Sequence, residues 1–254
     1  MTCALRAYEY WLASYRRVWR GTVVTSLLNP VLYLTALGVG LGKLVNRGGS
    51  GLGVPYLDYV APGMLAAVAM QLGAFESAYP VMAAIRWTRQ FHAMLATPLR
   101  VRDLLAGHQL YVATRIASVA AVYLAVLAGF GTIHSPFAIL AWPVAVTIAL
   151  AFSAPVSALA AWLERDEGFN VLFRFGVTPM FLFSGTFFPV TRLPHGVREI
   201  AYATPLWHGV DLMRQLTLGR VALWSSLGHA AYLLLFVAAG FALALRTYTR
   251  RLVT

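Results

Sequence analysis

The chain has 254 residues, of which 59% are hydrophobic and only 11% are charged. Soluble domains carry about 25% charged residues, so this composition excludes an ordinary soluble protein, whereas a bilayer is itself apolar and accommodates the surplus. The net charge of +11 comes from basic residues just outside the apolar stretches, which favours lipid headgroups over nucleic acid as the partner.

Residues 4–20 predict an amphipathic helix that lies in the membrane interface. The apolar side chains recur at helical spacing on one side: Leu5, Tyr8, Leu12, Tyr15 and Trp19. Four arginines supply the basic remainder, which suits a headgroup surface. The alternative is an ordinary solvated helix ahead of the first membrane span.

Six stretches are long and apolar enough to cross a bilayer, and we expect them to form a single membrane domain over residues 1–254. With both termini in the cytoplasm, the inner segments hold more arginines than the outer ones, so the chain is predicted to be a multi-pass protein of the cell membrane in that orientation. The predicted spans are 21–42, 57–78, 107–131, 136–163, 169–190 and 221–245.

Two connections are too long to be simple loops. Residues 79–106 face inward and have a helical pattern. Residues 191–220 face outward, and Pro194, Pro205 and Gly209 are expected to divide them into two short helices that re-enter the membrane surface. We therefore expect structure, and a role, in both connections.

Charged residues inside spans are costly and suggest function. Arg115 and Arg174 lie several residues from the inner side, where they either snorkel to the headgroups or face a transport pathway. Glu76 is expected to pair with an arginine that the sequence does not identify. Outside the spans, Asp211 and Arg214 are spaced for a local pair.

No catalytic or metal-binding motif is present. The run Gly38–Lys43 lacks the first glycine and the final Ser or Thr of a phosphate-binding loop. The six histidines form no HExxH or HxxxH pattern, and the single cysteine, Cys3, excludes a disulfide within the chain. We expect no enzyme active site, no bound metal and no bound cofactor on this chain.

Three stretches resemble the membrane subunit of ABC-2 type exporters, the family that includes permeases for daunorubicin, nodulation lipo-oligosaccharides and O-antigen polysaccharides. They are YLDYVAPGMLAA (56–67), LATPLRVRDLLAGHQL (95–110) and FLFSGTFFPVTRLPHGVREIAYATPLWHGVDLMRQLTLG (181–219). The resemblance implies that this chain forms half of a transport pathway. A second copy or a paralogue would complete it, and two separate ATP-binding subunits would bind ATP and Mg²⁺.

The resemblance also implies a cytoplasmic coupling helix over residues 86–97. Its apolar Trp87, Phe91 and Met94 would face the membrane domain. Its polar side chains would face the ATPase: Arg86, Arg89 and Gln90. The acidic turn would help to grip the ATPase: Glu164, Asp166 and Glu167. The alternative is a basic loop attracted to headgroups.

The outer region from Gly185 to Gly219 resembles a gate. Gly185 and Pro189 are expected to interrupt the fifth span. Four aromatic residues would form an apolar plug, or alternatively simple packing: Phe181, Phe183, Phe187 and Phe188. The SGTFFP run (184–189) resembles the nodulation and drug-resistance branch of the family. The expected substrate is an amphipathic drug or lipid, with a polysaccharide or lipo-oligosaccharide as the alternative. Two alternatives come from other protein classes. One is a membrane-embedded lipid enzyme, and the other is an ion-coupled transporter, for which Glu76 is the only supporting residue in the sequence.

Overall fold

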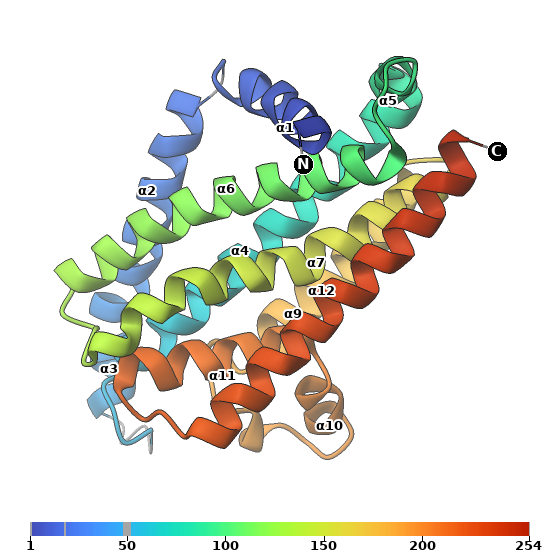
Figure 1. Cartoon of the computed structure of the whole chain (residues 1–254). Coiled ribbons are helices and arrows are strands. Elements are labelled where there is room, and N and C mark those ends of the chain that lie inside the picture. The colour runs from blue at the N-terminus through green and yellow to red at the C-terminus, as the bar shows by residue number, and fades with distance from the viewer. Residues whose placement is uncertain (1, 18, 48–51, 254) are drawn as a thin grey trace.

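Long helices make up the computed structural model, which describes residues 2–17, 19–47 and 52–253, apart from the side chains at 2, 22–27, 29, 30 and 39 (Figure 1). The described residues contain no strand, so the prediction of an all-helical protein is confirmed. Four helical runs among them are long and apolar enough to cross a membrane: Tyr56–Trp87, Val101–Gly129, Pro136–Trp162 and Leu223–Leu252.

These four runs form the centre of the bundle. The first is α4 (Tyr56–Met82), extended by the π-helical turn η2 (Ala83–Trp87). The second is α6 (Val101–Gly129). The third joins the 3₁₀ turn η3 (Pro136–Leu140) to α7 (Ala141–Trp162), and the fourth is α12 (Leu223–Leu252). Helix α7 packs against both α4 and α12, which places it between them.

The segment expected to be the first span is helical from Trp19 to Arg47. It consists of α2 (Trp19–Thr35), the π turn η1 (Ala36–Leu41) and α3 (Gly42–Arg47). The segment expected to be the fifth span consists of α8 (Glu167–Val171), the π turn η4 (Leu172–Val177) and α9 (Thr178–Phe183). Its helix ends at Phe183 rather than at residue 190, because Gly185 adopts a left-handed backbone with φ +83°.

Helix α1 (Thr2–Tyr15) is shorter than the expected 4–20 helix, since Trp19 already belongs to α2. Its packing face also differs from the prediction. Ala7 and Trp11 are buried, and α1 packs across α6, whereas Leu5 is 46% exposed. The helix therefore rests on the bundle through small and aromatic residues that the periodicity did not select.

The connection over residues 191–220 holds two helices, α10 (Val197–Tyr202) and α11 (Pro205–Leu218), after a 3₁₀ turn, η5 (Val190–Arg192). Pro205 begins α11, as prolines often do at the first helical position. Gly209 does not break a helix but lies inside α11, where an added Cβ would meet Ile148 Cδ1 at 2.5 Å. The expectation for Gly209 was therefore wrong: it allows α11 to approach α7 closely.

A polar chain crosses the core between α4, α6 and α7. The Ser77 and Ser153 hydroxyls lie 2.6 Å apart, and Ser153 donates to Gln109 Oε1 at 2.9 Å. The Gln109 amide in turn donates to Ser157 Oγ at 3.2 Å. Polar side chains in an apolar interior join helices when their hydrogen bonds are satisfied in this way.

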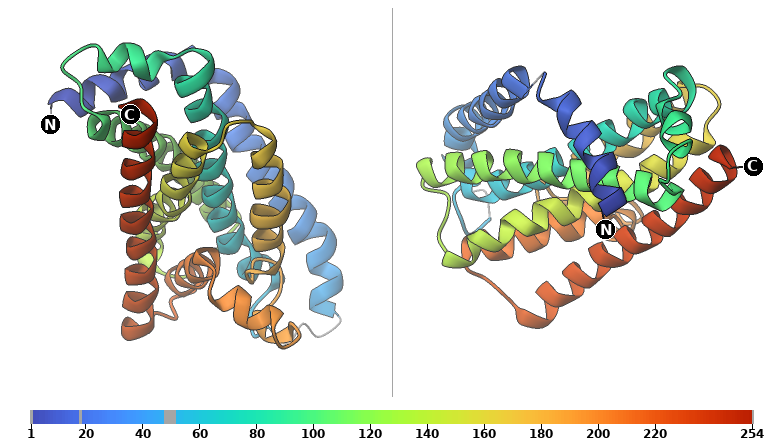
Figure 2. Two further views of the ribbon diagram at one scale, coloured as in Figure 1. Left: turned by 90° about the vertical axis from the view of Figure 1, so that its right-hand side faces the viewer. Right: turned by 45° about the horizontal axis from the view of Figure 1, so that its top comes forward.

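The bundle has two distinct ends. The chain termini, α1, the short helix α5 (Gln90–Leu95) and the turn between α7 and α8 gather at one end, which we call the termini end (Figure 2). Helices α3, α10 and α11 lie at the opposite end, which we call the far end (Figure 2).

Candidate functional site

The predicted coupling segment is not one helix. The π turn η2 ends at Trp87, and Arg89 adopts a left-handed backbone with φ +50° before α5 begins at Gln90. A non-glycine residue in this region is uncommon and marks a sharp change of direction. Residues on the two sides of the break therefore do not share one helical face.

This break changes which side chains pack inward. Phe91 is fully buried, with its ring 6.2 Å from Trp11 and 5.8 Å from Tyr248. Met94 also packs against the core. Trp87, by contrast, is 61% exposed, so the expectation that it embeds in the membrane domain was wrong.

The polar residues of the segment also have different surroundings. Gln90 accepts a hydrogen bond from the Tyr10 hydroxyl at 2.6 Å, so it binds α1 of its own chain rather than pointing to a partner. Arg86 is half-buried, and its Nη2 has no hydrogen-bond partner within the described part of the chain. Arg89 is exposed, as are the three acidic residues of the α7–α8 turn at the same end: Glu164, Asp166 and Glu167.

Trp11, which the sequence analysis did not single out, joins this segment to the bundle. Its ring stacks on Tyr111 at 5.6 Å and meets His108 edge-on at 4.9 Å. Gly107 makes the crossing possible, because an added Cβ there would lie 2.6 Å from the Ala7 Cβ. The only sequence signal was the i, i+4 spacing of Ala7, Trp11 and Tyr15.

Glu76 and Arg115 form an ion pair between α4 and α6, and their side chains are only 14% and 17% exposed. The Tyr111 hydroxyl donates to the second oxygen of Glu76 at 3.2 Å, and the guanidinium lies 5.5 Å from the Tyr15 ring. Arg115 therefore points to a partner inside the bundle rather than to the surface. Arg174 is exposed on η4, and no contact brings it to this pair.

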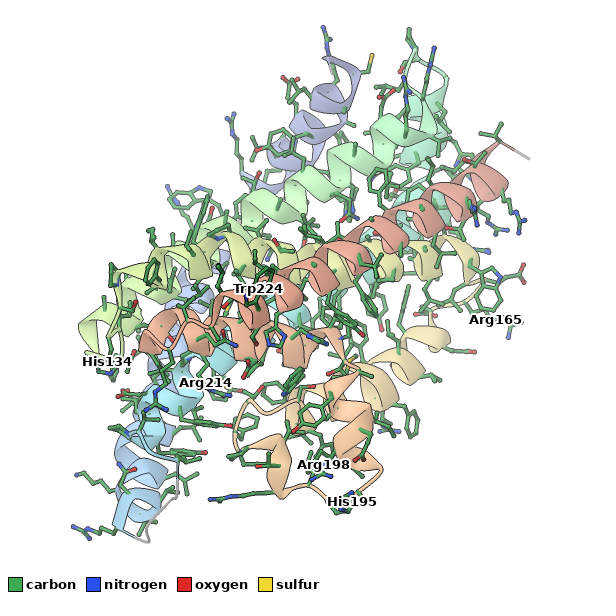
Figure 3. The ribbon with its side chains drawn as sticks, turned by 60° about the horizontal axis from the view of Figure 1, so that its bottom comes forward. His134, Arg165, His195, Arg198, Arg214 and Trp224 are labelled. Carbon is green, nitrogen blue, oxygen red and sulfur yellow. The ribbon has the colours of Figure 1, made fainter. Side chains whose placement is uncertain are left out.

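At the far end, the segment Ser184–Pro189 (the gate loop) is fastened by Arg214 of α11 (Figure 3). The guanidinium donates to the Gly185 carbonyl at 2.9 Å and to the Tyr59 carbonyl at 3.1 and 3.2 Å, and it lies 3.6 Å from the Tyr59 ring. Arg214 thus links the gate loop to α4. The expected pair with Asp211 is absent from these contacts, because Asp211 binds His229 and Gln215 instead.

The aromatic residues of the gate region face two separate pockets rather than one plug. Phe187, Phe188 and Pro189 line a cavity of about 410 Å³ together with Leu37, Leu41, Val45, Leu52, Tyr56 and Arg192. Phe181 packs edge-on against Phe187 at 5.1 Å. Phe183 lines a second cavity, of about 310 Å³, between α9 and α10. The gate loop therefore separates two apolar cavities.

The sequence analysis missed Tyr59, the backbone partners of Arg214 and the pairing of His208 with His229. Tyr59 stood inside a quoted family stretch, and Arg214 is a half-buried charge in α11. A charge there signals a partner but does not identify it. Within the described ranges, no three His, Cys, Asp or Glu side chains gather as metal ligands.

Comparison with known proteins identifies the family of this chain. Residues 5–218 match the family described as ABC-2 type transporter. The chain is 33% identical to nodulation protein J of Rhizobium leguminosarum bv. viciae over 95% of both chains. It is 31% identical to nodulation protein J of Rhizobium meliloti (strain 1021) over 95% of this chain and 94% of that protein. It is also 23% identical to the inner membrane transport permease YadH of Escherichia coli (strain K12), over 81% of this chain and 78% of that protein.

Proposed function

Because the chain belongs to the ABC-2 type transporter family, we propose that it is the permease subunit of an ATP-driven exporter with six spans and cytoplasmic termini. The matched region includes both the α5 segment and the gate loop. In this proposal the termini end faces the cytoplasm and the far end faces outward. The excess of arginines in the inner segments supports this orientation.

Two ATP-binding subunits would dock at the termini end and hold ATP and Mg²⁺, while a second copy or paralogue of this chain would complete the pathway. One observation carries the docking site: Phe91 fixes α5 to the bundle, whereas Trp87 and Arg89 stay exposed beside it. A segment that is rigidly seated and still presents a large aromatic and a cation can both bind a partner and transmit its motion.

The substrate in this proposal is amphipathic, such as a drug or a lipid. The cavity of about 410 Å³ beside the gate loop is lined mostly by apolar residues, with Arg192 among them, which suits an apolar tail and an anionic or polar headgroup. A lipo-oligosaccharide is the second candidate, favoured by the similarity to nodulation proteins along nearly the whole chain.

The test is reconstitution with a candidate ATP-binding subunit in proteoliposomes, with ATP hydrolysis and export of a fluorescent lipid as readouts. We expect Trp87→Ala to weaken ATPase binding, while Trp224→Ala, which removes a still more exposed tryptophan at the far end, leaves it unchanged (Figure 3). Phe91→Ala should uncouple hydrolysis from export. Transport on an ion gradient without ATP would show that the proposal is wrong.

The same proteoliposomes separate the two substrate candidates. A fluorescent phospholipid and a lipo-oligosaccharide are supplied in turn, and ATP-dependent export of each is measured. Export of only the second would assign the pathway to the glycolipid class. Phe188→Ala should lower the export of whichever substrate occupies the cavity, because Phe188 lines it.

A further inference from the structure

Two histidines meet between α11 and α12 at the far end. The Nδ1 atoms of His208 and His229 lie 2.8 Å apart, and the other ring nitrogen of His229 lies 3.1 Å from Asp211 Oδ2. The His229 side chain is only 10% exposed. Trp207 meets both imidazoles edge-on, and Tyr232 stacks on His208 at 3.9 Å, so aromatic rings enclose the pair.

The hydrogen bonds determine how many hydrogens lie between the two rings. A carboxylate only accepts hydrogen bonds, so His229 Nε2 donates in its contact with Asp211, and the Ser225 hydroxyl lies 3.1 Å from the same nitrogen. The 2.8 Å contact between the two Nδ1 atoms then requires one hydrogen between them. Either ring can donate it, and while a single hydrogen bridges the two Nδ1 atoms the pair carries at most one positive charge. In both cases a single hydrogen fills the space.

A second proton is strongly disfavoured at this position. If both rings were doubly protonated, two N–H groups would face each other at 2.8 Å. Among the described residues, the only carboxylate in contact with the pair is Asp211, which also accepts a hydrogen bond from Gln215 and lies near the positive charge of Arg214. The other titratable groups around the pair are the phenols of Tyr232, which stacks on His208, and of Tyr202, which packs edge-on against Trp207. Burial and the neighbouring His229 lower the pKa of His208 to about 4.

Helix α11 connects this pair to the gate loop. Three residues beyond Asp211 in the same helix, Arg214 holds the Gly185 carbonyl. On the side of α12, the Tyr232 hydroxyl binds the Ala203 carbonyl just before α11 begins. A change in the contact between α11 and α12 therefore reaches the helix that fastens the gate loop.

We propose that His208 and His229 form a proton-binding site with one proton shared between their Nδ1 atoms near neutral pH, and that the second proton, which makes both rings doubly protonated, separates α11 from α12 and loosens the gate loop. The proton site itself does not depend on the transport function proposed above. The ligand of this site is a proton, and the gate loop loosens at acidic pH.

The proton count is measured directly by ¹⁵N NMR of histidine-labelled protein in nanodiscs, with ring signals assigned by His208→Gln and His229→Gln. We expect one shared proton at pH 7 and uptake of the second only below about pH 5, on the order of 100-fold weaker than for a free imidazole. Removal of either histidine should shift the titration of the other, while His195→Gln, an exposed histidine at the same end, should not.

Independent titration of His208 and His229 near pH 6.5, with neither affected by loss of the other, would overturn the proton site. The proposal would also be overturned if the NMR signal of the shared proton vanished after a chelator was added and returned with Zn²⁺, because the pair would then bind metal. The wild-type titration needs no variant, so misfolding of a variant does not obscure the result.

The loosening of the gate loop has its own readout. Ser184→Cys, in a Cys3→Ser background, places a thiol at a position that is 1% exposed. Its labelling rate is divided by that of His195→Cys at each pH, which cancels the pH dependence of thiol reactivity. We expect this ratio to rise at least several-fold between pH 7 and pH 4.5, and not to rise when His208→Gln is added. A ratio that is constant with pH would show that protonation does not reach the gate loop.

Discussion

At the scale of single residues, the chain stabilises its internal charges in two different ways. Arg115 is paired with a carboxylate from another helix, whereas Arg214 donates to backbone carbonyls and lies on an aromatic ring. Both solutions satisfy a cation that would be costly if left alone in an apolar interior. The sequence shows that these arginines are unusual, but the type of partner follows from neighbours distant in the chain.

Glu76→Gln should destabilise the protein by about 3 kcal/mol, because Arg115 keeps its charge and loses its carboxylate partner in a site that is mostly buried. Thermal unfolding in detergent measures this. The double variant Glu76→Gln with Arg115→Met should recover part of the loss. Arg174→Met, which removes an exposed arginine, is the control and should change stability by under about 0.5 kcal/mol. If Glu76→Gln and Arg174→Met lowered the stability by the same amount, the ion-pair assignment would be contradicted.

Gly185→Ala should disturb the gate loop more than its backbone strain alone predicts. A left-handed alanine costs roughly 1 kcal/mol, and here the new Cβ would also lie 3.0 Å from Val190 Cγ2. Gly131→Ala is the matched control, since Gly131 has φ +71° but open space around it. We expect the difference between the two variants to appear in thermal stability and in export rate. Equal losses would mean that the loop is not closely packed.

At the scale of elements, α1 and α5 form one unit at the termini end. Trp11 and Tyr10 of α1 contact Phe91 and Gln90 of α5, while Trp11 also stacks on α6. Helical periodicity predicted both segments as surface helices. It did not reveal that they hold each other, because the left-handed turn at Arg89 and the close crossing at Gly107 are set by contacts between elements.

Gly107→Leu should displace α1 from α6, since even the first carbon of the new side chain would lie 2.6 Å from the Ala7 Cβ and 2.9 Å from the Ala4 carbonyl. Limited proteolysis near the amino terminus should become faster, and ATP hydrolysis should become less dependent on substrate. Gly129→Leu lies in the same helix with nothing within 4 Å, so it should have neither effect. Unchanged proteolysis of the Gly107 variant would show that α1 does not depend on this crossing.

At the scale of the whole molecule, the two ends differ in what they expose. The termini end presents Trp87, Arg89 and the acidic turn after α7, whereas the far end holds the gate loop, the two cavities and the histidine pair. A membrane protein with separate features at its two ends is suited to couple an event on one side of the bilayer to an opening on the other.

The proposed orientation is tested with a membrane-impermeant maleimide on intact cells. In a Cys3→Ser background, His195→Cys at the far end should be labelled directly, because the His195 side chain is 88% exposed. Asp166→Cys at the termini end in the same background, and Cys3 in the protein without substitutions, should be labelled only after the cells are permeabilised. The opposite pattern would invert the topology and place the gate loop in the cytoplasm.

The sequence by itself determined the membrane class, the helical fold and the family resemblance, because apolar length and helical periodicity are local properties that each segment carries. It also located the breaks at Gly185, Pro194 and Pro205. Only the tertiary structure decided which residues work together. Glu76 and Arg115 are 39 positions apart, and Tyr59 and Arg214 are 155 apart. Such pairs depend on how helices cross and on where backbone carbonyls are left open, and no single segment contains that information.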